Sequence, residues 1–270
     1  MKKILAALLC LVMVMAVFAG CGSGDAQSAA GSAADESDRT TFTVGFDAEY
    51  PPFGYMDTDG SYTGFDLELA QAVCDMEGWE FVATPIDWDA KDMELNSGSI
   101  DCIWNGFTIN GREDDYTWSQ PYCDNSQVIV VKSGSGITSL ADLAGKTVGV
   151  QTASAAETVL TDPEQQKDLA DTFGQMNDFK DYNTAFAELD AGAIDAIAVD
   201  IGVANYQLSS REGFEILDET LNSEQYGVGF KLGNTELCDI IDADLQALYD
   251  DGTVTELAEK YEIADMICLK

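Results

Sequence analysis

A single arginine, Arg112, stands at the end of a polar turn within residues 101–122, whose sequence is DCIWNGFTINGREDDYTWSQPY. The turn is rich in asparagine, glycine and threonine, so its backbone N–H groups are available to an anion. A guanidinium is a planar, two-pronged donor that matches a carboxylate, and it keeps its charge at any accessible pH. These residues therefore predict a site for a small carboxylate. The alternative is a surface arginine in a salt bridge with Glu113 or Asp114.

The composition excludes several functional classes. The chain has 49 acidic and 13 basic residues and a formal charge of −36. Loss of Lys2 and Lys3 with an export signal would leave 11 basic residues and a charge of −38. Such a surface repels nucleic acid, so we expect no nucleic-acid partner. The chain has no histidine, which removes imidazole zinc sites and triads with a histidine base, and we expect neither a metal nor another cofactor.

The cysteines show no metal or redox pattern. Five follow residue 21, namely Cys74, Cys102, Cys123, Cys238 and Cys268. None has CxxC spacing, so a zinc or redox motif is not predicted. Because the number is odd, at least one thiol is unpaired; one disulfide is possible, and the sequence does not assign it. Cys74 and Cys102 lie in apolar patterns and are expected to act as small hydrophobic residues.

Residues 1–20 have the pattern of an export signal: a basic start, a short apolar stretch and small residues before Cys21. The stretch is too short for a membrane-spanning helix. The sequence FAGC (18–21) resembles a bacterial lipobox, which implies that Cys21 is lipidated; simple secretion is the alternative. Residues 21–40 include a glycine- and serine-rich run and predict a flexible tether. We therefore expect a globular body held near a membrane face.

Apolar periodicity in the remaining residues predicts strands that alternate with helices. The predicted strands are 43–46, 80–83, 100–104, 127–131, 146–150, 193–199 and 228–231. The predicted helices are 65–74, 90–95, 155–160, 184–190, 239–248 and 254–261, with a capped helical turn at 139–143. This order favours an α/β fold with largely parallel sheets.

Two segments have the same construction. LNSGSIDCI (95–103) parallels LDAGAIDAI (189–197), and in each a glycine in the left-handed conformation ends a helix before a buried strand. Two such units suggest two similar lobes. Ligands of open α/β sheets bind beyond the carboxyl ends of the strands, so Arg112 and Asp200 would point into one cleft. Arg112 would offer a cation to a carboxylate, and Asp200 an anion to an ammonium group. Together they predict a site for a zwitterion.

Seven motifs follow one another along the chain. They are VGFDAEYPPFGY (44–55), GFDLELAQAV (64–73), IDWDAKDMELNSGSIDCI (86–103), GFTINGRE with SQPY (106–113, 119–122), SLADLAGKTVGVQTAS (139–154), AFAELDAGAIDAIAVD (185–200) and YGVGFKLGN (226–234). Their joint order resembles that of the polar amino-acid family, family 3, of bacterial extracellular solute-binding proteins. Members of this family are the receptors of ABC importers.

The resemblance implies a fold and a division of the chain. The fold is α/β and bilobal, of the periplasmic-binding-protein-like type II, with a ligand cleft between two α/β lobes. Lobe 1 would comprise residues 41–127 and 227–270, and lobe 2 residues 128–226. Two crossover strands, near 125–131 and 224–229, would join the lobes and let them close.

The resemblance also implies the residues of the ligand site. These are Asp47, Tyr50, Trp88, Gly106, Thr108, Arg112, Ser154, Ala155 and Asp200. Arg112 would bind the ligand α-carboxylate together with Gly106 and Thr108, and Asp200 would pair with the α-ammonium.

The other positions have narrower roles. Ser154 and Ala155 match a pair that is often threonine or serine, and Ala155, without a hydroxyl, can offer only its N–H. Tyr50 and Trp88 match positions that stack on the ligand, and the alternative for both is a plain core aromatic.

Two acidic residues bear on ligand choice. Asp47 could hold a basic or polar side chain, and a cation would also satisfy a buried Glu49 carboxylate. Alternatively, Glu49 caps the turn before the following prolines and faces water. We expect a polar or basic amino acid, because no second arginine or lysine near the motifs would receive an acidic one.

The expected function is capture of a free amino acid and its delivery to an ABC permease, by a monomer and without catalysis. The expected location is the extracellular face of the cytoplasmic membrane, anchored through Cys21, in the style of a Gram-positive lipoprotein. One alternative is a sensor domain of a larger membrane assembly. The other is an enzyme on the same fold, although no paired acid–base constellation is evident.

Overall fold

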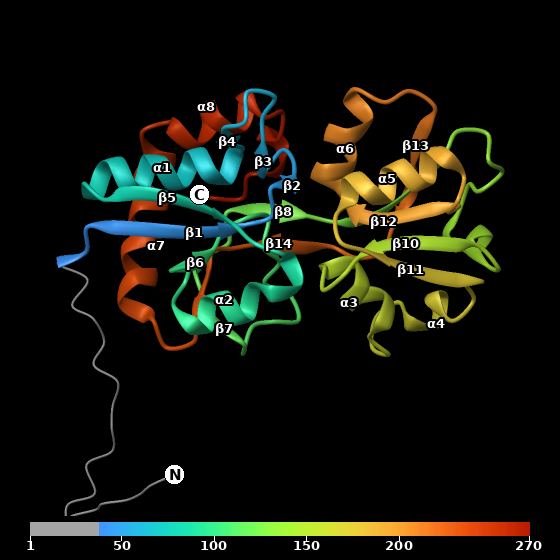
Figure 1. The fold of residues 1–270 in the computed structure, drawn as a ribbon, viewed down its shortest axis with the longest axis horizontal. Helices are drawn as coiled ribbons and strands as arrows, with labels where there is room; N and C mark the ends of the chain where they lie inside the picture. The colour runs from blue at the N-terminus through green and yellow to red at the C-terminus, as the bar shows by residue number, and fades with distance from the viewer. Residues whose placement is uncertain (1–37) are drawn as a thin grey trace, which may run out of the picture. The chain divides into compact units, whose positions relative to one another are not determined.

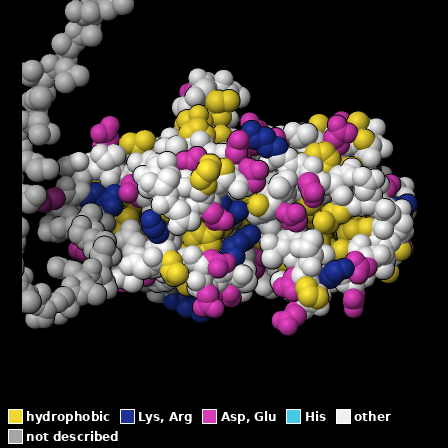
Figure 2. All heavy atoms as spheres, turned by 60° about the horizontal axis from the view of Figure 1, so that its bottom comes forward, with side chains coloured by type: hydrophobic (Ala, Val, Ile, Leu, Met, Phe, Trp, Pro, Cys, Tyr) yellow, Lys and Arg dark blue, Asp and Glu magenta, His cyan; other side chains and the backbone are white. Residues whose placement is uncertain are grey.

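The structure, a computed structural model, describes residues 38–270. The predicted signal peptide, Cys21 and all but the last three residues of the predicted tether lie outside the described residues. Among those described, no helix is long and apolar enough to cross a membrane. Figure 2 shows Asp and Glu side chains spread over the face in view, with Lys and Arg side chains between them.

The first lobe is built on a five-stranded sheet with the order β5-β1-β6-β15-β7. Its strands are β1 (Thr41–Phe46), β5 (Glu80–Pro85), β6 (Cys102–Ile103), β7 (Tyr116–Trp118) and β15 (Gly229–Lys231). Its helices are α1 (Phe65–Glu77), α2 (Lys91–Ser97), α7 (Thr235–Asp250) and α8 (Thr253–Lys260), with 3-10 turns at Trp88–Ala90 and Ala264–Met266. Figure 1 shows α1 and α2 on opposite sides of β1.

The second lobe repeats this plan on a sheet with the order β11-β10-β12-β9-β13. Its strands are β9 (Gln127–Lys132), β10 (Thr147–Gln151), β11 (Gln175–Phe179), β12 (Ala196–Asp200) and β13 (Phe214–Thr220). Its helices are α3 (Ala155–Thr161), α4 (Lys167–Ala170), α5 (Tyr182–Ala191) and α6 (Ile201–Ser209), with a 3-10 turn at Leu140–Leu143. In Figure 1, α5 and α6 lie on one side of this sheet and α3 and α4 on the other.

Both sheets are mixed, so the expectation of largely parallel sheets was too simple. In each, one central strand has two parallel neighbours: β1 pairs with β5 and β6, and β10 with β11 and β12. The remaining pairs are antiparallel, with β15 on β6 and β7, and β9 on β12 and β13. The strand through which the chain enters the second lobe, β9, and the strand through which it re-enters the first, β15, run antiparallel to the core strands β12 and β6.

The two crossings form a small sheet of their own. β8 (Cys123–Asn125) pairs antiparallel with β14 (Glu224–Tyr226). The chain leaves the first lobe through β8 and returns through β14, which is where the crossover strands were expected. The residue numbers at which the lobes divide stay a prediction.

The repeated glycines end their helices as predicted. Gly98 follows α2 with φ 78° and Gly192 follows α5 with φ 75°, both in the left-handed region. The capped turn at Ser139 is also confirmed, with a capping box between Ser139 and Asp142. The hairpin strands β2 (Glu49–Tyr50), β3 (Gly54–Met56) and β4 (Tyr62–Thr63) were not predicted, because their side-chain pattern is too short to show a period.

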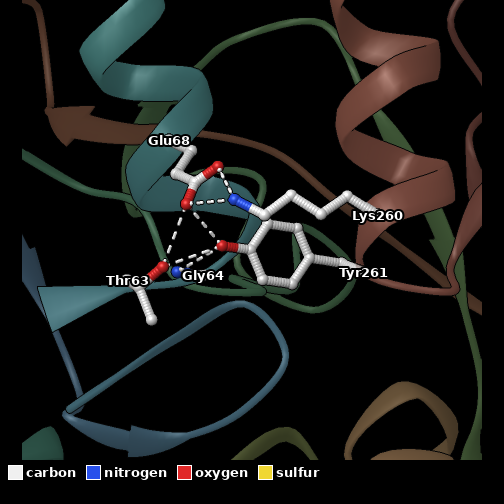
Figure 3. A network of polar contacts seen from close by, with 5 residues as sticks. All are labelled: Thr63, Gly64, Glu68, Lys260 and Tyr261. Carbon is white, nitrogen blue, oxygen red and sulfur yellow. Dashed lines mark hydrogen bonds and ion pairs between the residues drawn. The ribbon is translucent and has the colours of Figure 1, made fainter. Parts of the chain in front are cut away.

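A polar network fixes the hairpin and the start of α1 to the C-terminal helix (Figure 3). The Tyr261 hydroxyl lies 2.8 Å from the Thr63 hydroxyl and 2.7 Å from a Glu68 carboxylate oxygen, and it accepts the Gly64 N–H at 3.2 Å. Lys260 closes the network with an ion pair to Glu68 at 2.6 Å. The network therefore positions the first turn of α1, which reaches the site described below.

The cysteines form no disulfide among the described residues. All five are free thiols, and Cys74 and Cys102 are fully buried. The prediction that these two act as small hydrophobic residues is confirmed.

Candidate functional site

A small cavity lies between the lobes, close to the crossover strands. It is lined by Tyr50, Trp88, Gly106, Thr108, Arg112, Gln151, Ser154, Ala155 and Asp200. All the predicted site residues except Asp47 are in this set, and Gln151 is an addition. The space that remains is about 10 Å³, close to the minimum for one water molecule. The lobes are therefore closed on one another, and the role of each residue as a ligand contact stays a prediction.

Arg112 is held in place by its own turn. Its Nη1 donates to the Thr108 carbonyl oxygen at 3.1 Å, and its guanidinium lies over the Phe107 ring at 5.3 Å. Among the described residues it forms no salt bridge with Glu113 or Asp114, which the alternative interpretation requires. The guanidinium is thus oriented without its charge being neutralised.

A second cation stands near Arg112 and was missed by sequence reasoning. Lys91 is 5 % exposed and donates to the carbonyl oxygens of Trp88 and, across the cleft, Ala153, both at 3.3 Å. Burial, with a smaller contribution from the charge of Arg112, lowers the pKa of Lys91 to about 8. The end of the cavity formed by Arg112 is therefore a region of positive potential. No local pattern in the sequence singled out Lys91. Lysine side chains are mostly exposed to solvent, so a buried one is not expected from sequence.

The turn before Arg112 depends on Gly106. This glycine has φ +57°, and a Cβ there would lie 2.9 Å from the Tyr50 ring. Its N–H donates to Asp66 of α1 at 2.6 Å, and the Asp66 carboxylate also accepts from Tyr122 at 2.9 Å. Burial is the main cause that raises the pKa of Asp66 to about 7. Asp66 of α1 thus fixes the position of the turn that contains Gly106.

Two buried carboxylates meet at the other end of the cavity. Asp200 and Glu224 are each 2 % exposed. One oxygen of each accepts from the amide groups of Asn125 and Gln127, at 2.7–2.8 Å. Tyr226 donates a further hydrogen bond to Asp200 at 2.6 Å. Among the described residues neither carboxylate has an ion pair, so the pair is hydrogen-bonded but not neutralised.

This arrangement favours a cation. Burial raises the pKa of Asp200 to about 6, and repulsion from Glu224 adds to the rise. Thr108, in the turn before Arg112, donates to Glu224 at 2.8 Å. This hydrogen bond connects the two ends of the cavity. Glu224 was not predicted; the one sequence signal that could have found it is its place in a crossover strand, 24 residues after Asp200.

The second lobe contributes the start of α3 and the end of β10. Ser154 caps α3 by accepting the Glu157 N–H at 3.1 Å, and Ala155 is the first residue of that helix. Gln151, the last residue of β10, donates to the Asp47 carboxylate in the first lobe at 2.6 Å. Asp47 therefore lies behind the cavity wall rather than in its lining, and burial raises its pKa to about 6.

Glu49 is half-buried and does not line the small cavity. Its carboxylate accepts a hydrogen bond from the Asn183 side chain of α5, in the opposite lobe. Glu49 thus belongs to the contacts that hold the lobes together, with Asp47–Gln151 and Lys91–Ala153. Both roles predicted for Glu49 from the sequence stay predictions.

The two aromatic residues are buried and also line the cavity, and their role of stacking on a ligand stays a prediction. Tyr50 packs against Tyr182 of the second lobe with ring centroids 6.0 Å apart. Trp88 packs edge-on against Phe107 at 5.5 Å. Both rings are at least nine-tenths buried, and both line the cavity. They form the apolar walls between its charged ends.

Comparison with known proteins identifies the family. Residues 42–264 match the model of the bacterial extracellular solute-binding proteins, family 3. The chain belongs to this family. The two-lobed fold and the resemblance drawn from the seven motifs are thereby confirmed.

Relatives with assigned names cover most of the chain. The L-cystine-binding protein TcyJ of Escherichia coli (strain K12) is 31% identical over 233 residues, which are 85% of each chain. The arginine-binding extracellular protein ArtP of Bacillus subtilis (strain 168) is 30% identical over 266 residues, covering 97% of this chain and 98% of the relative.

Solved structures of amino-acid-binding proteins have the same fold. The substrate-binding protein of an ABC uptake transporter from Streptococcus pneumoniae, with bound histidine, superimposes with a TM-score of 0.77 at 35% identity, covering 82% of this chain and 92% of the other. An ancestral arginine-binding protein with bound arginine gives 0.76 at 36% identity, covering 83% and 98%.

The buried carboxyls predict how stability depends on pH. We expect the free energy of unfolding of the ligand-free protein to fall as the pH rises from about 4.5 to 6.5. The native pKa values of Asp47, Asp66 and Asp200 lie above the unfolded value, so over this window the native state holds protons that the unfolded state has lost. This contribution is complete below the unfolded pKa and disappears as the pH passes the native pKa.

Urea unfolding at a series of pH values would measure the slope. Asp66→Asn should make it shallower by up to about 1.4 kcal/mol per pH unit, the limit for one group. Asp59→Asn is the control, because hydrogen bonds from Ser61 lower the pKa of this exposed carboxyl. An unchanged slope in Asp66→Asn would contradict the assignment of a raised pKa to that residue.

Proposed function

We propose that this protein is the receptor of an ABC-type amino-acid importer, and that it binds a free α-amino acid in the cavity between its lobes. The observation that carries the proposal is the placement of Arg112 and Asp200 in the lining of one closed cavity. A zwitterion needs a cation for its carboxylate and an anion for its ammonium group. The names of the relatives support the same class of ligand, since they specify cystine and arginine.

Closure explains how such a receptor retains its ligand. The α-carboxylate would lie on the guanidinium of Arg112, and the α-ammonium would supply the positive charge that Asp200 and Glu224 lack. A ligand that bridges both lobes binds the closed state more tightly than the open one, and this difference in affinity shifts the equilibrium. The antiparallel pair of β8 and β14 would serve as the hinge.

The charge around the cavity supports a polar or basic ligand. Asp47, Asp200 and Glu224 are buried carboxylates on or next to the cavity wall, and an acidic ligand side chain would add to their mutual repulsion. The two described cations close to the cavity, Arg112 and Lys91, stand at its carboxylate end.

An enzyme on this fold is the main alternative. One structural neighbour is an ancestral amino-acid-binding protein described as a precursor of cyclohexadienyl dehydratase, with 30% identity and a TM-score of 0.76. The carboxylates of the present cavity are each engaged by several hydrogen-bond donors, an arrangement that suits binding of a cation. Turnover of any bound compound would favour the enzyme.

We expect loss of ligand binding when either charge of the cavity is removed. Arg112→Ala should weaken amino-acid binding by about 3–5 kcal/mol, because a buried carboxylate would lose its partner. Asp200→Asn should weaken amino acids but not analogues that lack the ammonium group. Isothermal titration of both variants with an amino acid and its deaminated analogue would measure this.

Arg211→Ala is a matched control for Arg112→Ala. Arg211 lies over the Phe186 ring at 5.6 Å, much as Arg112 lies over Phe107, but it does not line the cavity. Its removal should leave the affinity unchanged. Normal binding by Arg112→Ala, or equal losses of both ligands in Asp200→Asn, would remove the basis of the proposed site.

The proposal includes a location. We infer that the protein is a monomer held at the extracellular face of the cytoplasmic membrane through a lipid on Cys21, which lies outside the described residues. The motif FAGC and the tether sequence support this inference.

Cys21→Ser should release the protein from the membrane, because one lipid anchor would be lost. Fractionation of cells that express each form, followed by immunoblotting, would measure the distribution. Cys268→Ser, which alters a half-buried thiol, should leave the protein in the membrane fraction. Retention of Cys21→Ser in that fraction would exclude this cysteine as the anchor.

A further inference from the structure

A second, larger space adjoins the small cavity. This groove has a volume of about 630 Å³, within the range of small-molecule sites. Trp88 lines both spaces. Asp47 lines the groove and accepts the hydrogen bond of Gln151, which lines the cavity. Trp88 and the Asp47–Gln151 pair therefore form the partition between the two, and separation of that pair would join them.

The groove carries charges of both signs. Of the described residues that line it, five are acidic and one is basic: Asp47, Glu49, Asp87, Glu94, Asp181 and Lys180. Lys180 precedes α5 in the second lobe, and its Nζ lies 2.6 Å from Asp87 of the first lobe. Both side chains are mostly exposed, at 72 % and 61 %, so each can exchange this contact for a ligand.

The groove also has an apolar part to its lining. Pro85, Ile86 and Trp88 line it together with Met93, whose side chain is 65 % exposed. An exposed methionine is an adaptable surface for an apolar chain or for sulfur. The lining of the groove thus combines apolar side chains with positive and negative groups.

We propose that the preferred ligand has two α-amino-acid heads joined by a short apolar linker, such as a disulfide or a thioether. The inference rests on the proposed function: the first head occupies the cavity of Arg112 and Asp200. The second head lies in the groove, with its carboxylate on Lys180 and its ammonium on Asp87 or Asp181.

The charges of the groove distinguish this class from simpler ones. A ligand with a purely cationic tail would approach the ammonium of Lys180, and one with an anionic tail would meet the surrounding carboxylates. A second zwitterionic head satisfies both signs. It would also replace the exposed Lys180–Asp87 ion pair with two new charge-assisted hydrogen bonds between the lobes.

Binding of matched ligands tests the proposal. The purified protein would be unfolded and refolded to remove carried-over compounds and then titrated with L-cystine, L-cystathionine, L-arginine and S-methyl-L-cysteine. The last has the first head and the sulfur of cystathionine but no second head. We expect the two-headed ligands to bind at least about tenfold more tightly than the one-headed ones, the effect of one further charge-assisted hydrogen bond.

Lys180→Gln separates recognition of the second head from a general effect on closure. It should weaken the two-headed ligands by about tenfold. Because loss of an exposed ion pair is worth at most about fivefold, the one-headed ligands should change by less than that. Lys167→Gln is the control, since Lys167 is also in an exposed ion pair, with Asp171 at 2.5 Å, in the same lobe.

Two results would overturn the inference while leaving the proposed function intact. One is tighter or equal binding of arginine or S-methyl-L-cysteine by the unaltered protein. The other is an equal loss for all ligands in Lys180→Gln. If no amino acid binds the unaltered protein, the proposed function itself fails, together with the inference that rests on it.

Discussion

The unneutralised pair of carboxylates at the crossover is the constraint around which the structure is arranged. Asp200 and Glu224 share the amide donors of Asn125 and Gln127, and these four residues come from β12, β14, β8 and the start of β9. The two lobes and both crossings of the chain therefore meet at one buried negative site. A buried charge without a counter-ion is unfavourable unless it is hydrogen-bonded or protonated; here both carboxylates are hydrogen-bonded, and burial raises the pKa of Asp200.

This constraint couples binding to movement. The donors that stabilise the carboxylates lie on the crossover strands, so a change of charge at Asp200 acts where the lobes bend. The opposite end of the cavity is built on the first lobe by Asp66, Gly106 and Arg112, with Lys91 reaching across to Ala153. In the proposed function, positive potential at one end and negative potential at the other would make the cavity complementary to a zwitterion and reduce the reorganisation that binding requires.

The contacts between the lobes show how a ligand could compete with the protein itself. Gln151 donates to Asp47, and Asn183 donates to Glu49, so amide groups of the second lobe satisfy acids of the first. These bonds hold the lobes closed on a space of about 10 Å³. They are neutral donors to carboxylates, and a cationic group on a ligand would make a stronger hydrogen bond to the same oxygens.

The parts of the fold and site that could be predicted are those with local signals. Gly98 and Gly192 end their helices in a conformation that glycine favours, and the repeated Ile-Asp that follows marks a buried strand. Arg112 was singled out by the turn that precedes it, and Asp200 by its place at the end of a strand. Family motifs then added the aromatic walls and Ser154.

The residues that were missed depend on contacts between distant segments. Lys91, Gln151 and Glu224 are ordinary polar residues in their local sequence, and they acquire a role only where the lobes meet. Asp47 was predicted to bind the ligand, which stays a prediction; its carboxylate accepts a hydrogen bond from Gln151, which comes 104 positions later. No periodicity within either segment contains that information. The hairpin β2–β4 was missed because strands of two or three residues have no recognisable alternation.

A thermal-shift screen of the refolded protein against the amino acids, each paired with its deaminated and decarboxylated analogues, tests the central claim most directly. A ligand that binds only the native state raises the melting temperature by mass action. If the cavity recognises a zwitterion through Arg112 and Asp200, at least one amino acid will raise the melting temperature, and neither of its analogues will do so to the same extent. Equal shifts with the analogues, or no shift with any amino acid, would contradict the account.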